Sequence, residues 1–196
     1  MSDETATTLF PLSPMQQGMV FHSLYAPRRG VDIEQVVITF PEDIEARAMA
    51  EAWRWALGRH AILRTAMRWQ GVEQVRQEVW ERLPFEFAAH DWSDLPAAAL
   101  RRQLEDFLRA DRARGFRLDV APLWRVRLLQ TGGQEHRLVF SFHHLLLDSR
   151  AVVVLLNEVL TAYDDFRRGL EPNLPPPVPY RHYLEWLETQ DWREGE

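Results

Sequence analysis

The 196-residue sequence contains no cysteine and no lysine. Without cysteine there is no disulfide, no thiolate metal ligand, no iron–sulfur cluster and no cysteine nucleophile. All 23 basic residues are arginine, so chemistry through a lysine Schiff base is excluded as well. Histidine and the carboxylates are the side chains left to carry catalysis.

Long apolar runs are missing too. The N-terminus is acidic and has no apolar signal core, and no stretch approaches the ~18 apolar residues of a membrane-spanning helix. The net charge is −6, and no basic stripe is interleaved with aromatic residues. We therefore expect a cytoplasmic protein with neither a membrane nor a nucleic-acid partner.

Two common catalytic signatures are also absent. The sequence has no glycine-rich loop of the kind that cradles phosphates, and no Gly-x-Ser-x-Gly motif. The sequence therefore lacks the motifs that usually indicate nucleotide binding or hydrolysis by a catalytic serine.

The hydrophobic content is high, at 46% with 8 Trp and 10 Phe, which suffices for one packed domain. The alternation of patterns predicts an α/β two-layer sandwich in which helices flank a mixed, largely antiparallel sheet. Strands are expected at residues 31–40, 62–69, 72–80, 85–87, 123–130 and 137–142. Helices are expected at residues 14–24, 45–59, 95–112, 149–160 and 180–191.

The spacing of apolar residues is clear in the expected helix 45–59 and weak in the expected helix 14–24. Residues 45–59 have a continuous apolar face of Ala48, Met49, Ala52, Trp53, Ala56 and Leu57. In residues 14–24 the apolar positions Met15 and Met19 lie about one turn apart. Gln16 and Gln17 then lie either beside a cleft or in solvent, and we favour solvent. The strand residues 36–38 (VVI) are expected to be buried on both faces.

The strongest candidate for chemistry is the stretch 142–149 (FHHLLLDS), where two histidines end a strand and a carboxylate follows. A helix is expected from Ser149, with Asp148 or Ser149 as its N-cap. If strand geometry persists through His143 and His144, their side chains leave opposite faces, so one faces a site and the other packs. The two imidazoles then do not converge on one ion, and we expect no metal site. The alternative is that both histidines are structural.

Four segments in this order resemble the condensation domains of nonribosomal peptide synthetases, which share a fold with chloramphenicol acetyltransferase. Residues 12–22 (LSPMQQGMVFH) and 59–65 (RHAILRT) are similar to the first two family motifs. Residues 143–148 (HHLLLD) are similar to the active-site motif HHxxxD, and 180–187 (YRHYLEWL) to the fourth. Two positions depart from the pattern: His182, where Asp is more usual, and Ser149, where the family has Gly.

The resemblance implies the architecture. The fold would be the N-terminal lobe of a chloramphenicol acetyltransferase-like sandwich, spanning residues 9–171 after a disordered segment 1–8. Residues 172–179 contain five prolines and are expected to form an extended linker. Residues 180–196 would be a terminal helix or the start of a connection to a second lobe. The chain is shorter than half of the family's usual length, which implies that only this lobe is present.

The resemblance also implies residue roles. His144 would be the catalytic base and His143 its packing partner, since an imidazole with a pKa of ~6.5 suits proton transfer at neutral pH. Asp148 would hold the loop through an arginine, with Arg64 and Arg150 as the candidates. Ser149 would narrow the acceptor channel or add a hydroxyl to it.

Three functions remain open. The first is amide-bond formation between aminoacyl groups carried as thioesters on the phosphopantetheine arms of peptidyl carrier proteins. The second is proton abstraction and elimination, for example dehydration, on one carrier-bound amino acid. The third is a non-catalytic lobe that docks a carrier protein or a neighbouring synthetase domain. The chain itself would bind no cofactor, and self-association through an open lobe face is a further expectation.

Overall fold

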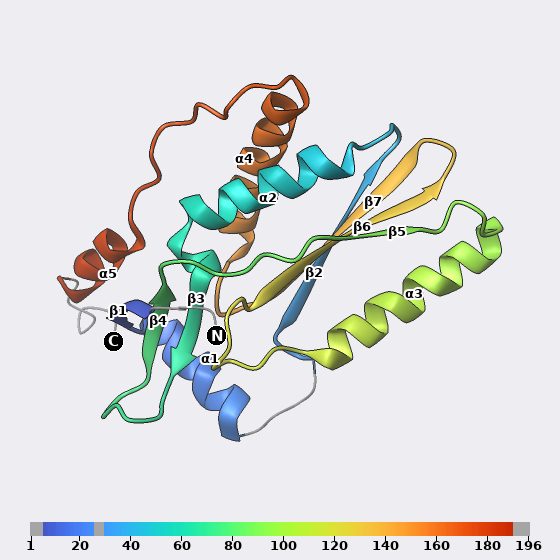
Figure 1. Ribbon diagram of the computed structural model, residues 1–196. Coiled ribbons are helices and arrows are strands. Elements are labelled where there is room, and N and C mark those ends of the chain that lie inside the picture. Colours follow the sequence, from blue (N-terminus) through green and yellow to red (C-terminus); the bar gives the residue numbers. More distant parts are fainter. Residues whose placement is uncertain (1–5, 26–29, 190–196) are drawn as a thin grey trace.

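The computed structural model describes residues 6–25 and 30–189 (Figure 1). Predicted and observed elements agree in order and type for most of this length. The elements are β1 (Ala6–Pro11), α1 (Pro14–Tyr25), β2 (Ile33–Phe40), α2 (Ala46–Arg59), the 3-10 helix η1 (Ala61–Arg64), β3 (Thr65–Arg68), β4 (Arg76–Trp80), β5 (Ala88–Asp91), α3 (Ala97–Arg114), β6 (Trp124–Gly132), β7 (Glu135–His143), α4 (Ser149–Arg167) and α5 (Tyr180–Glu188).

The larger sheet has the strand order β2-β7-β6-β5. Strand β7 pairs antiparallel with both β2 and β6, whereas β5 runs parallel to β6. The β6–β7 hairpin turns at Gly132 and Gly133, whose φ values of 120° and 57° are accessible to glycine without a Cβ clash. The predicted mixed, largely antiparallel sheet is thus confirmed, and the strand that ends in the histidines lies inside it.

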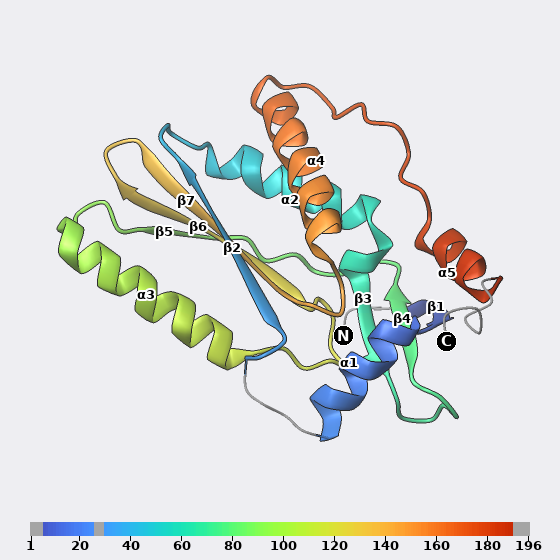
Figure 2. The ribbon, with the colours of Figure 1, turned by 180° about the vertical axis from the view of Figure 1, so that it is seen from behind.

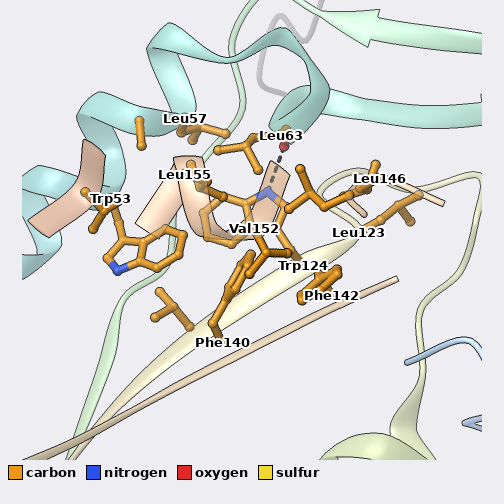
Figure 3. Close-up of a cluster of buried hydrophobic side chains, with 14 of the residues drawn as sticks. Trp53, Leu57, Leu63, Leu123, Trp124, Phe140, Phe142, Leu146, Val152 and Leu155 are labelled. Atoms are coloured by element: carbon orange, nitrogen blue, oxygen red, sulfur yellow. Dashed lines mark hydrogen bonds between the residues drawn. The ribbon is translucent and has the colours of Figure 1, made fainter. Parts of the chain in front are cut away.

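One face of this sheet is covered by α2 and α4 (Figures 1 and 2). All six predicted apolar residues of α2 are buried. The Trp53 ring centroid lies 4.8 Å from that of Phe140 and 5.4 Å from that of Trp124, so the helix packs directly on β6 and β7. Figure 3 shows this core, including the bond from Trp124 Nε1 to the Leu63 carbonyl at 2.8 Å.

The other face carries α3, which is held by polar contacts rather than a deep apolar core. No residue of α3 is fully buried. Gln35 Nε2 donates to the Leu108 carbonyl at 3.1 Å and to Asp111 Oδ2 at 3.0 Å, and Arg125 forms an ion pair with Asp111. Burial opposes the charged carboxylate, but bonds from Arg125, Ser141 and Gln35 outweigh it and lower the pKa of Asp111.

A second, smaller sheet has the order β1-β4-β3, and both of its pairings are antiparallel. The predicted hairpin around Gly71 is confirmed. The predicted disorder of residues 6–8 is wrong, because Ala6–Pro11 pairs with the edge of β4 and completes three strands. Residues 1–5 lie outside the described part of the chain.

Three further expectations need correction. Residues 61–64 form a 3-10 helix before the strand begins. Residues 85–87 are not a strand. The ring of Phe85 packs on that of Trp124, with 5.7 Å between the ring centroids, and the next strand begins only at Ala88. The 36–38 segment is not buried on both faces: β2 is the edge strand, and Val37 is 38% exposed.

After α4 the chain runs without helix or strand through the proline-rich residues 172–179 to α5. In Figure 1 this segment leads from the far end of α4 back to the small sheet. Arg59 donates to the Pro175 carbonyl along this path. Among the described helices, none is long and apolar enough to cross a membrane.

Candidate functional site

The two histidines lie where β7 ends and the chain turns toward α4. The His143 amide donates to the Leu123 carbonyl and the His144 amide to the Asp32 carbonyl, each at 2.9 Å. These acceptors precede β6 and β2, the two neighbours of β7, so the strand end is fixed from both sides. The Leu146 amide closes the turn on the His143 carbonyl at 3.0 Å.

His143 is a buried, hydrogen-bonded residue. Only 4% of it is exposed, and its Nδ1 accepts a bond from the Leu145 amide at 3.2 Å. An accepting Nδ1 places the ring hydrogen on Nε2. Burial lowers the pKa of His143 to about 4, with a smaller lowering from His144, against an opposing effect of Asp32. The ring is therefore neutral at physiological pH and acts in the structure as an acceptor.

His144 differs in both respects. It is partly exposed, and its Nδ1 is buried with no hydrogen-bond partner among the described residues. The other two such atoms in that part of the chain are indole nitrogens, of Trp53 and Trp80. An imidazole nitrogen with unused hydrogen-bonding capacity, at the edge of a rigid turn, is the kind of group that functional sites leave unsatisfied.

A pocket of about 590 Å³ lies on the His143 side of the turn. It is formed between the end of α1, the start of β2 and the segment after α3, with Leu24, Asp32, Trp69 and Phe116 among its lining residues. Ser23 Oγ donates to Asp32 Oδ2 at 2.9 Å beside it. His144 does not line this pocket, so the two imidazoles face different surroundings, as strand alternation predicts.

Asp148, one of the two predicted N-cap candidates, caps α4. Its Oδ1 accepts from the Ala151 amide at 2.7 Å, and its backbone is extended at φ −85° and ψ 174°. Ser149 is the first residue of the helix and is exposed. Ser149 was expected to narrow a substrate channel or to add a hydroxyl to it. That role stays a prediction.

The expected arginine partner of Asp148 is wrong for both candidates. Arg64 instead donates to the carbonyls of Leu57, Gly58 (2.7 Å) and Trp80 (2.9 Å). The physical reason is that the last turn of α2 leaves carbonyls without intrahelical partners, and a guanidinium supplies several donors at once. Burial lowers the pKa of Arg64. Arg150 is exposed, and no ion pair joins it to Asp148 in the described structure.

Gln16 is a site residue that the sequence pattern placed wrongly. We expected it in solvent, but it is buried with 6% exposure, and its Nε2 donates to the Leu145 carbonyl at 3.1 Å. Gln17, in contrast, is exposed as predicted. The signal was present: Ser13 and Gln16 have capping-box spacing, and they exchange bonds of 3.0 and 3.3 Å.

A second polar cluster was also missed. Arg59 and His60, at the end of α2, both contact Glu158 of α4, at 2.8 and 2.7 Å. Burial opposes the charge on Glu158, but bonds from Arg59 and His60 outweigh it and lower the pKa of the carboxyl. This cluster links α2 and α4, the two helices that cover one face of the sheet. Nowhere in residues 6–25 and 30–189 do three or more His, Asp or Glu side chains gather as a metal site would require.

The sequence of this chain is similar to a known protein family and to several known proteins. A family model described as "Condensation domain" matches residues 6–196. Linear gramicidin synthase subunits C and D of Brevibacillus parabrevis are 38% and 39% identical, each over 96% of this chain. Bacitracin synthase 1 of Bacillus licheniformis is 30% identical over 95% of it. The chain spans only 2–4% of the length of these relatives.

Solved structures agree on the fold. The starter condensation domain of rhizomide synthetase matches with a TM-score of 0.83 and 18% identity, covering 92% of this chain and 43% of that one. The first condensation domain of the CDA synthetase matches with a TM-score of 0.78 and 14% identity, covering 89% and 42%. At these identities the likeness shows the fold, which is the chloramphenicol acetyltransferase-like sandwich that the four motifs implied.

Proposed function

This chain belongs to the condensation-domain family of nonribosomal peptide synthetases, and we propose that it takes part in amide-bond formation with His144 as the general base. Condensation domains are acyltransferase-type units that work with carrier proteins. The finer statement, that His144 performs the proton transfer on carrier-bound aminoacyl thioesters, is the proposal developed below.

The observation that carries the proposal is the contrast between the two imidazoles. His143 is buried, neutral and already engaged by the Leu145 amide. His144 is partly exposed, and its ring has unused hydrogen-bonding capacity. A general base must reach the proton it removes. His143 lines the pocket but is only 4% exposed and already bonded, so the partly exposed His144 suits the task better.

The proposed chemistry balances without any bound cofactor. The amine of the acceptor aminoacyl group attacks the carbonyl carbon of the donor thioester, so a C–N bond forms and a C–S bond breaks. His144 Nε2 takes the proton that the amine loses and returns it to the departing thiolate. A positioned base of this kind contributes ~10²–10⁴-fold to the rate. The phosphopantetheine arms enter as parts of the substrates, carried by partner proteins.

The backbone of the turn supports this role. A base acts well only if its position is fixed before the reaction, because small misplacements are costly. The amides of residues 143, 144, 145 and 146 all donate to defined acceptors. The backbone of His144 is thus fixed by hydrogen bonds while the residue stays partly exposed.

The test uses two carrier proteins loaded with different aminoacyl groups, incubated with this chain and analysed by mass spectrometry. We expect the donor aminoacyl group to appear on the acceptor carrier in amide linkage. Loss of one water from a single loaded carrier would instead indicate elimination, and unchanged masses with carrier binding would indicate a docking lobe. Either outcome contradicts the proposal.

The residue assignment is tested with His144→Ala, compared with His22→Ala on the exposed surface of α1. We expect His144→Ala to lose transfer by at least ~10²-fold, the lower end of a general base's contribution, while the control retains it. Turnover by His144→Ala equal to that of the control would remove His144 from the reaction. His143→Asn, which keeps an acceptor for the Leu145 amide, then decides whether the other imidazole acts.

A further inference from the structure

Gln16 of α1 and Gln77 of β4 form a reciprocal pair of side-chain amides inside the molecule. Gln16 Nε2 donates to Gln77 Oε1 at 3.3 Å, and Gln77 Nε2 donates to Gln16 Oε1 at 3.1 Å. The two residues are 6% and 1% exposed. Two buried glutamines need several partners each, so their surroundings show what the pair is built to hold.

Those surroundings join four parts of the chain. Gln77 Nε2 also donates to the Pro11 carbonyl of β1 at 2.9 Å, and Gln16 Oε1 accepts from the Ser13 amide at 3.0 Å. Tyr180 Oη, at the start of α5, lies 3.5 Å from the same oxygen. The remaining donor of the pair, on Gln16 Nε2, is aimed at the Leu145 carbonyl at 3.1 Å.

Leu145 directly follows His144, and three successive peptide groups around that histidine are each fixed by a hydrogen bond. The peptide before it donates to the Asp32 carbonyl, and the peptide after it donates to His143 Nδ1. The next peptide is held at its carbonyl by Gln16, while its amide, that of Leu146, donates to the His143 carbonyl. Of these four bonds, only the one from Gln16 comes from a side chain outside the turn.

We propose that Gln16 and Gln77 are positioning residues for His144: the amide pair holds the Leu145 carbonyl and so fixes the backbone that orients the His144 ring. The inference rests on the proposed function for its catalytic consequence. The orientation of the His144 ring, in contrast, can be measured without any turnover. The pair acts through Leu145 and touches neither the ring nor a substrate.

Three variants and one control test the inference. Gln16→Leu removes the donor to Leu145 and both side-chain bonds between Gln16 and Gln77, while Gln77 keeps its bond to the Pro11 carbonyl. Gln16→Leu combined with Gln77→Leu removes both amides, which is less costly than leaving one buried and unsatisfied. Gln16→Glu keeps the oxygen that accepts from Ser13 and Gln77 but cannot donate to Leu145. Gln17→Leu makes the same change one residue along, at an exposed side chain.

The first measurement reads the histidine itself. Ring ¹⁵N chemical shifts of His144 and its rate of modification by diethyl pyrocarbonate are compared across the variants. We expect every folded Gln16 variant to shift or broaden the ring signals and to change the modification rate several-fold. Gln17→Leu should match the unsubstituted protein in both.

The second measurement is carrier-to-carrier transfer. We expect kcat to fall by ~10–100-fold with KM changed by less than about twofold, because a displaced base slows the chemical step and leaves carrier binding intact. If His144→Ala keeps full turnover, the proposed function fails, while the ring measurements still decide the positioning inference. Unchanged ring signals in any folded Gln16 variant would overturn it. So would the failure of all three variants to fold, since the pair would then serve the fold alone.

Discussion

At the scale of the residue, two adjacent histidines differ in burial and in one hydrogen bond from the backbone. His143 is enclosed and accepts from the Leu145 amide, so its proton-binding site is already occupied by a hydrogen bond. His144 has no such bond on the described part of the chain. Strand alternation predicts that the two differ, but only the positions of the Asp32 and Leu145 backbone groups show which one is free.

The neutral state of His143 predicts a pH dependence of stability. Its pKa is about 4 in the folded chain and 6.5 ordinarily. Between these values the unfolded chain binds a proton that the folded chain does not, so the free energy of unfolding falls as the pH falls through this window. The expected loss from this residue is on the order of 3 kcal/mol between pH 7 and pH 4.

Urea unfolding at several pH values measures this loss, with His143→Asn as the matched variant. Asparagine offers an accepting oxygen near the position of Nδ1 but does not titrate. Asp111 and Glu158 have lowered pKa values, so their contributions to the free energy of unfolding also fall as the pH falls. The informative quantity is therefore the difference between the two proteins. Identical pH profiles would show that His143 is not a buried, neutral imidazole in the folded chain.

At the scale of the element, sequence periodicity predicted the apolar helices well and the polar contacts poorly. The whole buried face of α2 followed from spacing, since its inward residues are apolar throughout. In α1 the inward position is Gln16, while Met15 is 69% exposed, so an apolar count pointed to the wrong face. A buried glutamine is recognised only by its partners, and Gln77 and Leu145 are 61 and 129 residues away.

The cap of α4 gives a prediction that separates two roles of Asp148. Asp148→Ala should lower stability by ~0.5–2 kcal/mol, because the Ala151 amide loses its acceptor. Asp148→Asn should retain that stability, since asparagine caps helices about as well as aspartate. Thermal and urea unfolding of the two variants provide the measurement.

An ion pair would behave differently. If the charge of Asp148 were needed to hold an arginine, Asp148→Asn would be destabilised as much as Asp148→Ala. We expect it not to be, because Arg64 is engaged by the Leu57, Gly58 and Trp80 carbonyls instead. The sequence does not encode which carbonyls the end of α2 leaves unsatisfied, so the partners of Arg64 could not be predicted from it.

At the scale of the whole molecule, the site depends on how distant segments are brought to one end of the sheet. The fold class and family were predictable because motif order and element order agree along the chain. Strand β1 of the small sheet was not, because it is polar at its start and pairs with β4, which is distant in the sequence. Side-chain contacts along the return of the chain from α4 to the small sheet include Arg59 with the Pro175 carbonyl and Tyr180 with Gln16.

These two contacts predict a coupling between the end of α2 and the placement of α5. Arg59→Gln should release the Pro175 carbonyl and loosen the segment that delivers Tyr180 to Gln16. The loss of one charge-assisted bond, about 1.4 kcal/mol, corresponds to about tenfold more frequent local opening. Hydrogen exchange of peptides covering residues 176–189 measures it, and peptides from α2 and α4 report whether the core remains closed.

Glu158→Gln is the matched control, because it neutralises the partner of Arg59 while leaving the Pro175 bond in place. Exchange in residues 176–189 should then rise in Arg59→Gln and stay near the unsubstituted rate in Glu158→Gln. Equal increases in both would assign the effect to the Arg59–Glu158 ion pair and the packing of α4 on α2. No increase in either would mean that α5 is held by its own contacts with the small sheet, and Gln16 would not depend on the path of the proline-rich segment.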